Sequence, residues 1–188
     1  MVSKKDALTA AAAELLWERG YSATSPAMIL ERSKAGQGSM YHHFAGKAEL
    51  AIAAMTHMSD QLRAKIETAL AAADTATARV NAYLDSERDP LAGCRMGRLL
   101  HDHDVVGDER LRAPVAEFFT WLTDRLTEVL ADGVRSAELR PDLDVATTAA
   151  HIVATVQGAY VLARAHQNPH EFNRAIDGAK HMLANLRA

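Results

Sequence analysis

The sequence predicts an all-α protein of about nine helices, and three observations support this fold class. Apolar residues recur three and four positions apart in the long segments, which is the spacing of one helix face. Alanine is abundant, whereas Gly and Pro are sparse inside these segments. Ser3 and Ser25 stand where N-cap residues are expected. With 188 residues and 48% apolar content, the chain can bury a substantial core.

Capping and helix-breaking residues indicate where the helices begin and end. Ser3 and Asp6 can form a capping box before the first helix, and Ser25 with Pro26 starts the second. Gly20 suits the position after a helix because it adopts left-handed conformations without strain. The predicted helices are Lys4–Arg19, Pro26–Arg32, Gln37–Phe44, Lys47–Ala72, Thr75–Ser86, Leu91–His101, Arg112–Ala131, Val145–His166 and His170–Leu186.

The two short helices near the amino end, joined by the turn 33–36, predict a helix-turn-helix inside a three-helix unit. The long helix that follows would span roughly 35–40 Å. Residues 101–110 are expected to form a polar connection, and Gly133 and Pro141 to bracket a loop. The last two helices have broad apolar faces, which suits either a four-helix dimer interface or a cap on the monomer core.

Charge and composition exclude several protein classes. The net charge is −3, and residues 1–50 are nearly neutral, so any attraction to DNA must be local. Cys94 is the only cysteine, which excludes an internal disulfide. No signal-peptide pattern and no run of about 18 apolar residues is evident, so we expect a cytoplasmic protein without membrane attachment. No catalytic constellation stands out, and we expect no enzyme activity and no cofactor.

The second short helix of the helix-turn-helix is rich in groups that suit a DNA groove. Gln37 offers an amide that can pair with adenine, and Tyr41 and His42 can reach phosphate oxygens. Lys47 would neutralise one phosphate. The alternative is a structural helical hairpin with an ordinary polar surface.

The same stretch resembles a known family. The run Gly38-Ser-Met-Tyr-His-His-Phe-Ala-Gly-Lys-Ala-Glu-Leu50, together with residues 11–16 and 20–25, is similar to the tetracycline-repressor (TetR) type regulators. The resemblance implies an all-helical homodimer with a DNA-binding domain at 1–46 and a helical ligand-binding and dimerisation domain at 47–188. It implies a double-stranded DNA operator and a small-molecule effector as partners, and it places Phe44 in the core. The contacts to phosphates or bases that it implies are Thr24, Ser25, Gln37, Gly38, Ser39, Tyr41, His42, His43 and Lys47.

The turn of the helix-turn-helix departs from the family pattern. The family commonly has Gly where this chain has Lys34, and Ser or Thr where it has Gly36. A positive φ at Lys34 would cost on the order of 1 kcal/mol.

Three further candidates remain in the helical body. Apolar and aromatic side chains between the fourth and seventh predicted helices can line an effector pocket that favours an apolar or aromatic molecule. They are Met55, Met58, Leu62, Tyr83, Met96, Leu100, Phe118, Phe119 and Leu122, and each can equally be core. Cys94, near the start of the helix expected at 91–101, could act as a redox sensor but is better explained as a small buried side chain. The tract 101–104, His-Asp-His-Asp, is spaced poorly for one ion, so we expect no metal.

The function predicted from these features is a dimeric DNA-binding transcriptional regulator. We expect a repressor that a small apolar or aromatic molecule releases from a palindromic operator, with dimerisation through the last two helices. Two alternatives remain open: a helical small-molecule or redox sensor without DNA binding, and a DNA-binding regulator without a ligand.

Overall fold

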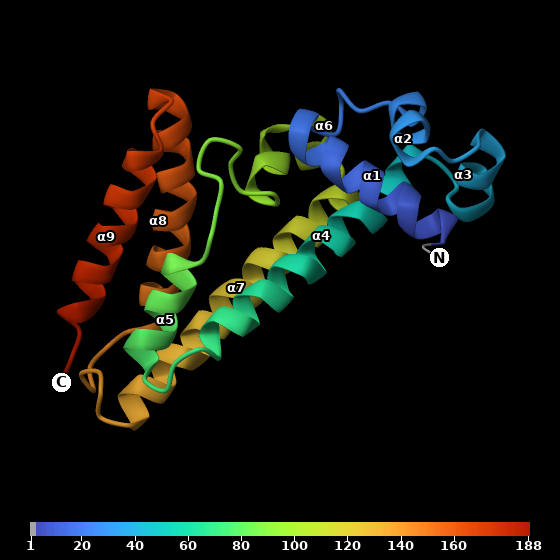
Figure 1. The fold of residues 1–188 in the computed structure, drawn as a ribbon. Coiled ribbons are helices and arrows are strands. Elements are labelled where there is room, and N and C mark those ends of the chain that lie inside the picture. Colours follow the sequence, from blue (N-terminus) through green and yellow to red (C-terminus); the bar gives the residue numbers. More distant parts are fainter. Residues whose placement is uncertain (1–2) are drawn as a thin grey trace. The chain divides into compact units, whose positions relative to one another are not determined.

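A computed structural model describes residues 3–188 and confirms the all-α fold class (Figure 1). An isolated bridge pairs Leu139 with Arg187, but the described residues form no β-strand. The helices of this region are α1 (Lys4–Arg19), α2 (Pro26–Ser33), α3 (Gln37–His43), α4 (Lys47–Leu70), α5 (Ala76–Asp85), the 3-10 helix η1 (Gly97–His101), α6 (His103–Gly107), α7 (Glu109–Arg135), α8 (Val145–His166) and α9 (Pro169–Ala184).

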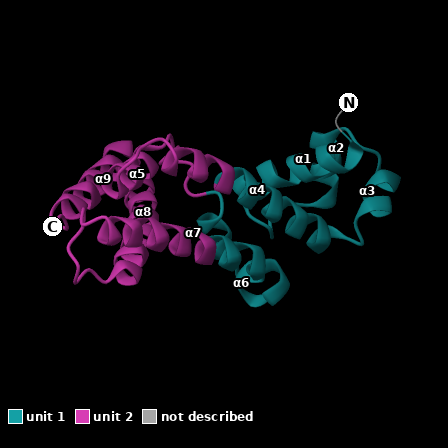
Figure 2. Ribbon diagram, turned by 90° about the horizontal axis from the view of Figure 1, so that it is seen from below, with its two compact units in different colours: residues 1–62, 95–118 teal, residues 63–94, 119–188 magenta. Residues whose placement is uncertain are grey.

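The chain folds into two compact units (Figure 2). The first contains residues 1–62 and 95–118, and the second contains residues 63–94 and 119–188. Helices α4 and α7 each contribute residues to both units. This division by contacts differs from the functional division at residue 46 expected from the sequence, which remains a proposal.

In the first unit, α1 packs against α2, α3 and η1. The Oγ of Ser3 accepts from the N–H of Asp6 at 3.1 Å, which confirms the predicted cap of α1. An ion pair and a cation–π contact join α1 to the segment that leads into η1. The guanidinium of Arg95 donates to Glu14 at 2.8 Å and lies 4.1 Å from the ring centroid of Trp17. Because this ion pair is partly exposed, we expect it to position Arg95 more than to stabilise the fold.

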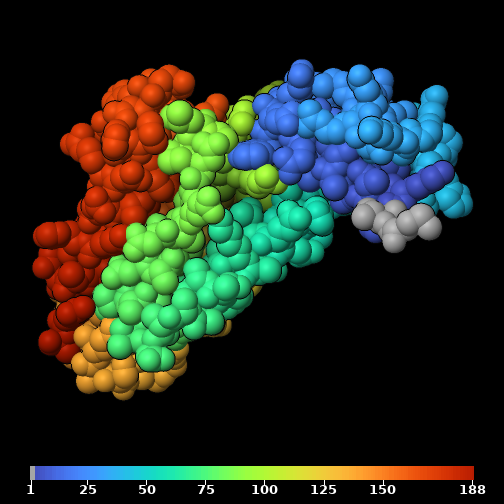
Figure 3. All heavy atoms as spheres, in the orientation of Figure 1, coloured from blue at the N-terminus to red at the C-terminus, as the bar shows by residue number. Residues whose placement is uncertain are grey.

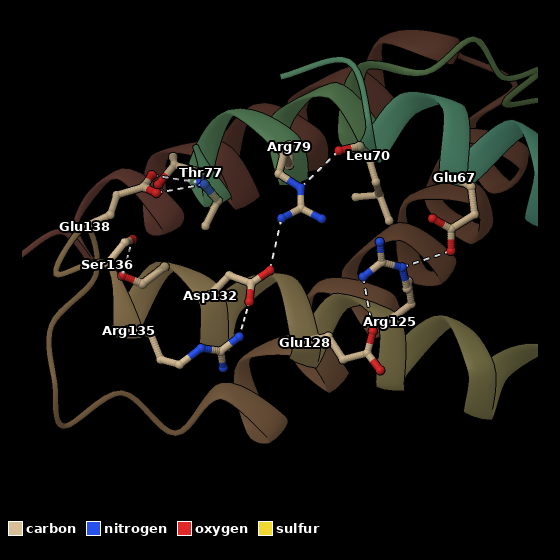
Figure 4. A network of polar contacts seen from close by, with 12 residues as sticks. Glu67, Leu70, Thr77, Arg79, Arg125, Glu128, Asp132, Arg135, Ser136 and Glu138 are labelled. Atoms are coloured by element: carbon tan, nitrogen blue, oxygen red, sulfur yellow. Dashed lines mark hydrogen bonds and ion pairs between the residues drawn. The ribbon is translucent and has the colours of Figure 1, made fainter. Parts of the chain in front are cut away.

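In the second unit, α8 packs against α9, and α9 also packs against α5 (Figure 1). Figure 4 shows a polar network that fixes the α4–α5 turn to the end of α7. Arg79 donates to the carbonyl of Leu70 at 3.0 Å and to Asp132 at 3.1 Å. The carboxylate of Glu138 accepts from the N–H groups of Ala76 and Thr77 at 2.7 and 2.8 Å, so it satisfies the free donors at the start of α5.

The predicted helix at 91–101 was wrong. That segment contains turns, with Gly93 at φ 86°, and only its last five residues form η1. The expected polar connection at 101–110 was also wrong, because Asp102 caps a further helix, α6, by accepting from the N–H of Asp104 at 3.1 Å. Cys94 is partly buried and precedes η1 by three residues, so it does not lie near the start of a helix at 91–101 as the redox-sensor hypothesis assumed.

The loop expected to begin at Gly133 begins three residues later, because α7 ends at Arg135. Gly133 lies inside α7, where a Cβ atom would come within 2.7 Å of the Cβ of Ala76 and 2.8 Å of the Cδ1 of Leu139. Close packing, rather than the end of a helix, therefore explains this glycine. The turn after α7 places Ala137 in the left-handed region at φ 56° and returns the N–H of Glu138 to the carbonyl of Gly133 at 2.9 Å.

Candidate nucleic-acid interface

Local sequence explains the geometry of α2, the turn and α3. Ser25 caps α2 by accepting from the N–H of Met28 at 3.3 Å, and Pro26 occupies the first turn, where a missing N–H costs nothing. Lys34 ends α2 in the left-handed conformation, with φ 54° and ψ 26°. The apolar sides of the two helices are buried through Ile29 and Met40. The opposite sides carry exposed polar residues. Figure 3 shows this part of the chain, in blue, at the surface of the molecule.

Most residues predicted to contact DNA lie at this surface. The exposed group contains Gln37, Gly38, Tyr41 and His42, and the side chain of Tyr41 is 55% exposed. Ser25, Ser39, His43 and Lys47 are half-buried. Phe44 is buried, as the family resemblance implies.

Thr24 requires a correction, because its side chain is only 1% exposed. Its hydroxyl donates to the carbonyl of Gly20 at 2.7 Å and lies 3.3 Å from the carbonyl of Leu15. The hydroxyl therefore joins the end of α1 to the start of α2 and is not presented to a phosphate. We remove Thr24 from the proposed side-chain contacts.

The side chain of Lys47 is placed by an aromatic ring. Its Nζ lies 4.1 Å from the ring centroid of Tyr21, within the range of a cation–π interaction. Burial raises the pKa of the Tyr21 phenol, and the carboxylates of Asp104, Asp108 and Asp102 raise it further, so the ring stays neutral. Tyr21 thus supports the ammonium group without forming an ion pair with it.

Ser22 joins the loop between α1 and α2 to the acidic segment around α6. Its N–H donates to Asp102 at 2.7 Å, and its Oγ lies 2.6 Å from Asp102 and 2.7 Å from Asp104. Burial acts to raise the pKa of Asp102, but the hydrogen bonds from Ser22 and from the N–H of Asp104 outweigh it and lower the pKa overall. The sequence showed Asp102 only as part of a polar tract. Its position before a helix was the signal that could have identified it as a cap.

No group of three His, Cys, Asp or Glu side chains suited to a metal ion occurs among residues 3–188. The 101–104 tract that suggested such a site instead supplies the cap of α6 and the acceptors for Ser22.

The residues predicted to line an effector pocket fall in both units, so their assembly into one site remains a prediction. Those in the first unit are Met55, Met58, Leu62, Met96, Leu100 and Phe118. Those in the second unit are Tyr83, Phe119 and Leu122. Most are buried, but Leu100 is 40% exposed and is the weakest candidate.

The α8–α9 hairpin presents an uncovered surface of a different kind. The exposed side chains of Val161, Leu162 and Met182 are among the large apolar groups that the described chain leaves in water. The ring centroids of Tyr160 and Phe172 lie 4.8 Å apart on the opposite, covered side.

α8 is long and apolar enough to cross a membrane by length and composition, with 28% of the segment buried. This finding corrects the expectation that no such segment exists.

Sequence profiles of known families match both regions of the chain. The profile described as bacterial regulatory proteins of the tetR family matches residues 8–54. The profile described as the tetracyclin repressor-like C-terminal domain matches residues 77–179, more than half of the chain. The chain belongs to the TetR family. As a TetR-family protein it is a DNA-binding transcriptional regulator and not an enzyme, which disfavours the alternative of a sensor that does not bind DNA.

Relatives of this TetR-family protein agree with the assignment. The transcriptional repressor KstR2 of Mycobacterium tuberculosis is 30% identical over 159 residues, which cover 76% of this chain and 72% of that protein. The transcriptional activator FasR of Mycolicibacterium smegmatis is 26% identical over 129 residues, covering 68% of this chain and 59% of that protein. The crystal structure of a TetR regulator from Chloroflexus aurantiacus superposes with a TM-score of 0.86 at 25% identity, covering 98% of this chain and 96% of that one.

Proposed function

We propose that this chain is a dimeric repressor that leaves a palindromic operator when a small apolar or aromatic molecule binds its helical body. The exposed polar face of α3 supports the DNA-binding part most directly. A helix of this kind can enter the major groove, and a symmetric pair would read two half-sites one or more turns apart. KstR2, which is described as a repressor, favours repression over activation.

The exposed side chains of α3 suggest how the contacts are divided. Gln37, in the first turn of α3, can form two hydrogen bonds with an adenine edge. Tyr41 and His42 can donate to phosphate oxygens, and Lys47 can neutralise a phosphate. Gly38, Ser39, Ser25 and His43 allow close approach or add hydrogen bonds at the same surface. Base contacts would select the operator sequence, and phosphate contacts would fix the register.

The uncovered face of α8 and α9 supports dimerisation through these two helices. Exposed small and apolar residues recur three and four positions apart along α8, namely Ala150, Ala154, Gly158, Val161, Leu162 and Ala165. A Cβ atom at Gly158 or at Gly178 of α9 would meet nothing within 4 Å in the monomer. Small residues on an apolar helix face allow a second pair of helices to pack closely. Because the chain is a TetR-family regulator, we assign this face to a partner subunit rather than to a membrane.

A ligand bound by the predicted effector residues would regulate DNA binding through α4. α4 is one helix that begins at Lys47 and ends at Leu70, a length of roughly 36 Å. A ligand that binds two conformations unequally would shift the spacing of the two DNA-binding surfaces through such a helix. We further propose that residues 1–46 bind DNA, that residues 47–188 bind ligand and dimerise, and that the protein acts in the cytoplasm.

A binding assay tests this proposal. The purified protein is titrated against a labelled duplex taken from the DNA upstream of its own gene, and a panel of apolar and aromatic compounds is then added. We expect nanomolar binding as a dimer and release by at least one compound that also raises the melting temperature. Tight binding that no compound changes would support a regulator without a ligand, and absence of binding would contradict the proposal.

A further inference from the structure

A single exposed cation stands in a strained position on the helix-turn-helix. Lys34 has φ 54° and ψ 26°, a left-handed conformation that a side chain with a Cβ atom disfavours. Its side chain is exposed and forms no ion pair with any residue in the described range 3–188. A strained residue whose side chain contributes nothing to the fold is a candidate for a role in binding.

The surroundings of Lys34 are suited to a phosphate backbone. Gly36 is exposed two residues later, and a Cβ atom there or at Gly38 would meet nothing within 4 Å, so the surface beside the lysine is bare backbone. Close approach of a second backbone is possible at such a surface. The turn lies between α2 and α3, so the lysine directly precedes the helix proposed to enter the groove.

The charges of the residues near the turn show why a single lysine matters for this surface. Arg32, the nearest other cation in sequence, donates through both terminal nitrogens to Glu18 at 2.6 and 2.8 Å, so its charge is already matched within the fold. Glu31 is exposed in the last turn of α2 and would repel DNA. Lys47 is held against the ring of Tyr21. Lys34 and Lys47 are therefore the two lysines of this surface whose charge no carboxylate matches within residues 3–188.

We propose that Lys34 is a DNA-backbone contact, in which its ammonium group binds a phosphate oxygen beside the groove that α3 enters. The inference rests on the proposed DNA-binding function and deepens it, because it adds a contact at a position where the family commonly has glycine. A phosphate contact is independent of sequence, so it would strengthen binding to operator and non-operator DNA alike. It would also make binding more sensitive to salt.

Three substitutions separate the charge of Lys34 from its backbone conformation. Lys34→Gly removes both the charge and the strain, Lys34→Asn removes the charge but tolerates the left-handed conformation, and Lys34→Arg keeps the charge. Binding is measured by fluorescence anisotropy over a range of salt concentrations, on the upstream duplex and on a duplex of scrambled sequence. The melting temperature of each variant without DNA is measured in parallel.

For Lys34→Gly and Lys34→Asn, we expect a log–log salt slope that is smaller by about two for the dimer, since each lost phosphate contact removes about 0.9. Affinity at low salt should fall on the order of tenfold and equally on both duplexes. Lys34→Arg should match the wild type. The melting temperature of Lys34→Gly should stay the same or rise by up to about 4 °C.

The failures are distinguishable. If the wild type binds both duplexes and the neutral variants keep its slope and affinity, Lys34 serves only the turn and this inference is overturned. If Lys34→Gly loses melting temperature together with binding, the residue is structural and the inference is also overturned. If the wild type itself shows no salt-dependent binding, the proposed function fails together with the contact.

Discussion

The α2–turn–α3 surface and the α8–α9 surface are both left uncovered, but their chemistry differs. The first is polar, with an amide, a phenol, imidazoles and a lysine directed away from a small apolar core. The second is apolar, with small residues spaced along α8 and large exposed groups at Val161, Leu162 and Met182. A polar face with few acids suits a phosphate-rich partner, whereas a small-residue apolar face suits a second protein surface. The comparison predicts that the two surfaces can be disabled independently.

The largest expected effect is on the α8–α9 surface. In Gly158→Leu, the new side chain meets nothing in the monomer but would enter the proposed interface twice, once from each subunit. At about 1–3 kcal/mol per overpacked site, dimerisation should weaken by about a hundredfold or more. Sedimentation velocity measures the loss. Gly107→Leu, at another position with open space around its Cβ atom, should remain dimeric. A dimeric Gly158→Leu protein would place the interface elsewhere.

Substitutions on the DNA-facing surface should weaken DNA binding but leave dimerisation intact. Tyr41→Ala and Lys47→Ala should each weaken binding to the upstream duplex on the order of tenfold, and Lys47→Ala should also reduce the salt slope by about two per dimer. Both variants should still sediment as dimers. Lys65→Ala removes a cation in the second unit and serves as the control. Unchanged affinity of both variants in the same assay would refute the assigned contacts.

A smaller effect distinguishes a buried hydroxyl from a phosphate contact. Thr24→Val keeps the shape of the side chain but removes the hydroxyl that donates to the carbonyl of Gly20 and lies near that of Leu15. We expect a loss of about 1–2 kcal/mol in the free energy of unfolding. This corresponds to a melting temperature lower by roughly 2–8 °C. DNA affinity at a temperature where the variant is folded should be unchanged. An equally stable variant with weaker DNA binding would restore Thr24 to the contact surface.

The smallest effect concerns the loop before the DNA-binding helices. Asp102→Asn weakens the acceptor for Ser22, and we expect a loss of about 1 kcal/mol at neutral pH. Because the pKa of Asp102 is lowered in the folded state, its contribution is complete above the unfolded value of about 3.9. It disappears as the pH falls through the lowered folded value. Urea titrations at several pH values test this, and a difference from the wild type that grows on acidification would disagree with it.

Features with a local cause could be predicted from the sequence. The limits of α1 and α8 were confirmed because caps and apolar spacing are encoded within the helices themselves. The same holds for the cap at Ser25. At Lys34 the sequence showed only a departure from the family's glycine and the cost of a positive φ, and the structure gives this residue φ 54°. The DNA-facing residues were suggested by their chemistry and by the family resemblance, and their roles remain predictions.

Features that depend on distant neighbours could not be predicted. Gly133 was interpreted as the end of a helix. The reason for this glycine is its close packing against Ala76 and Leu139, which only the fold brings near it. Thr24 was interpreted as a surface hydroxyl because the sequence does not show that the fold brings the carbonyls of Gly20 and of Leu15 in α1 close to it. Asp102 was interpreted as part of a solvated tract because Ser22, which donates hydrogen bonds to it, lies 80 positions away in the sequence.

The salt dependence of wild-type binding to its upstream duplex tests the central claim most directly. If the α3 surfaces of a dimer contact about six to ten phosphates in all, the logarithm of the binding constant should fall against the logarithm of salt concentration with a slope of about −5 to −9. A slope near zero would show that the protein does not bind DNA through this surface and would contradict the account.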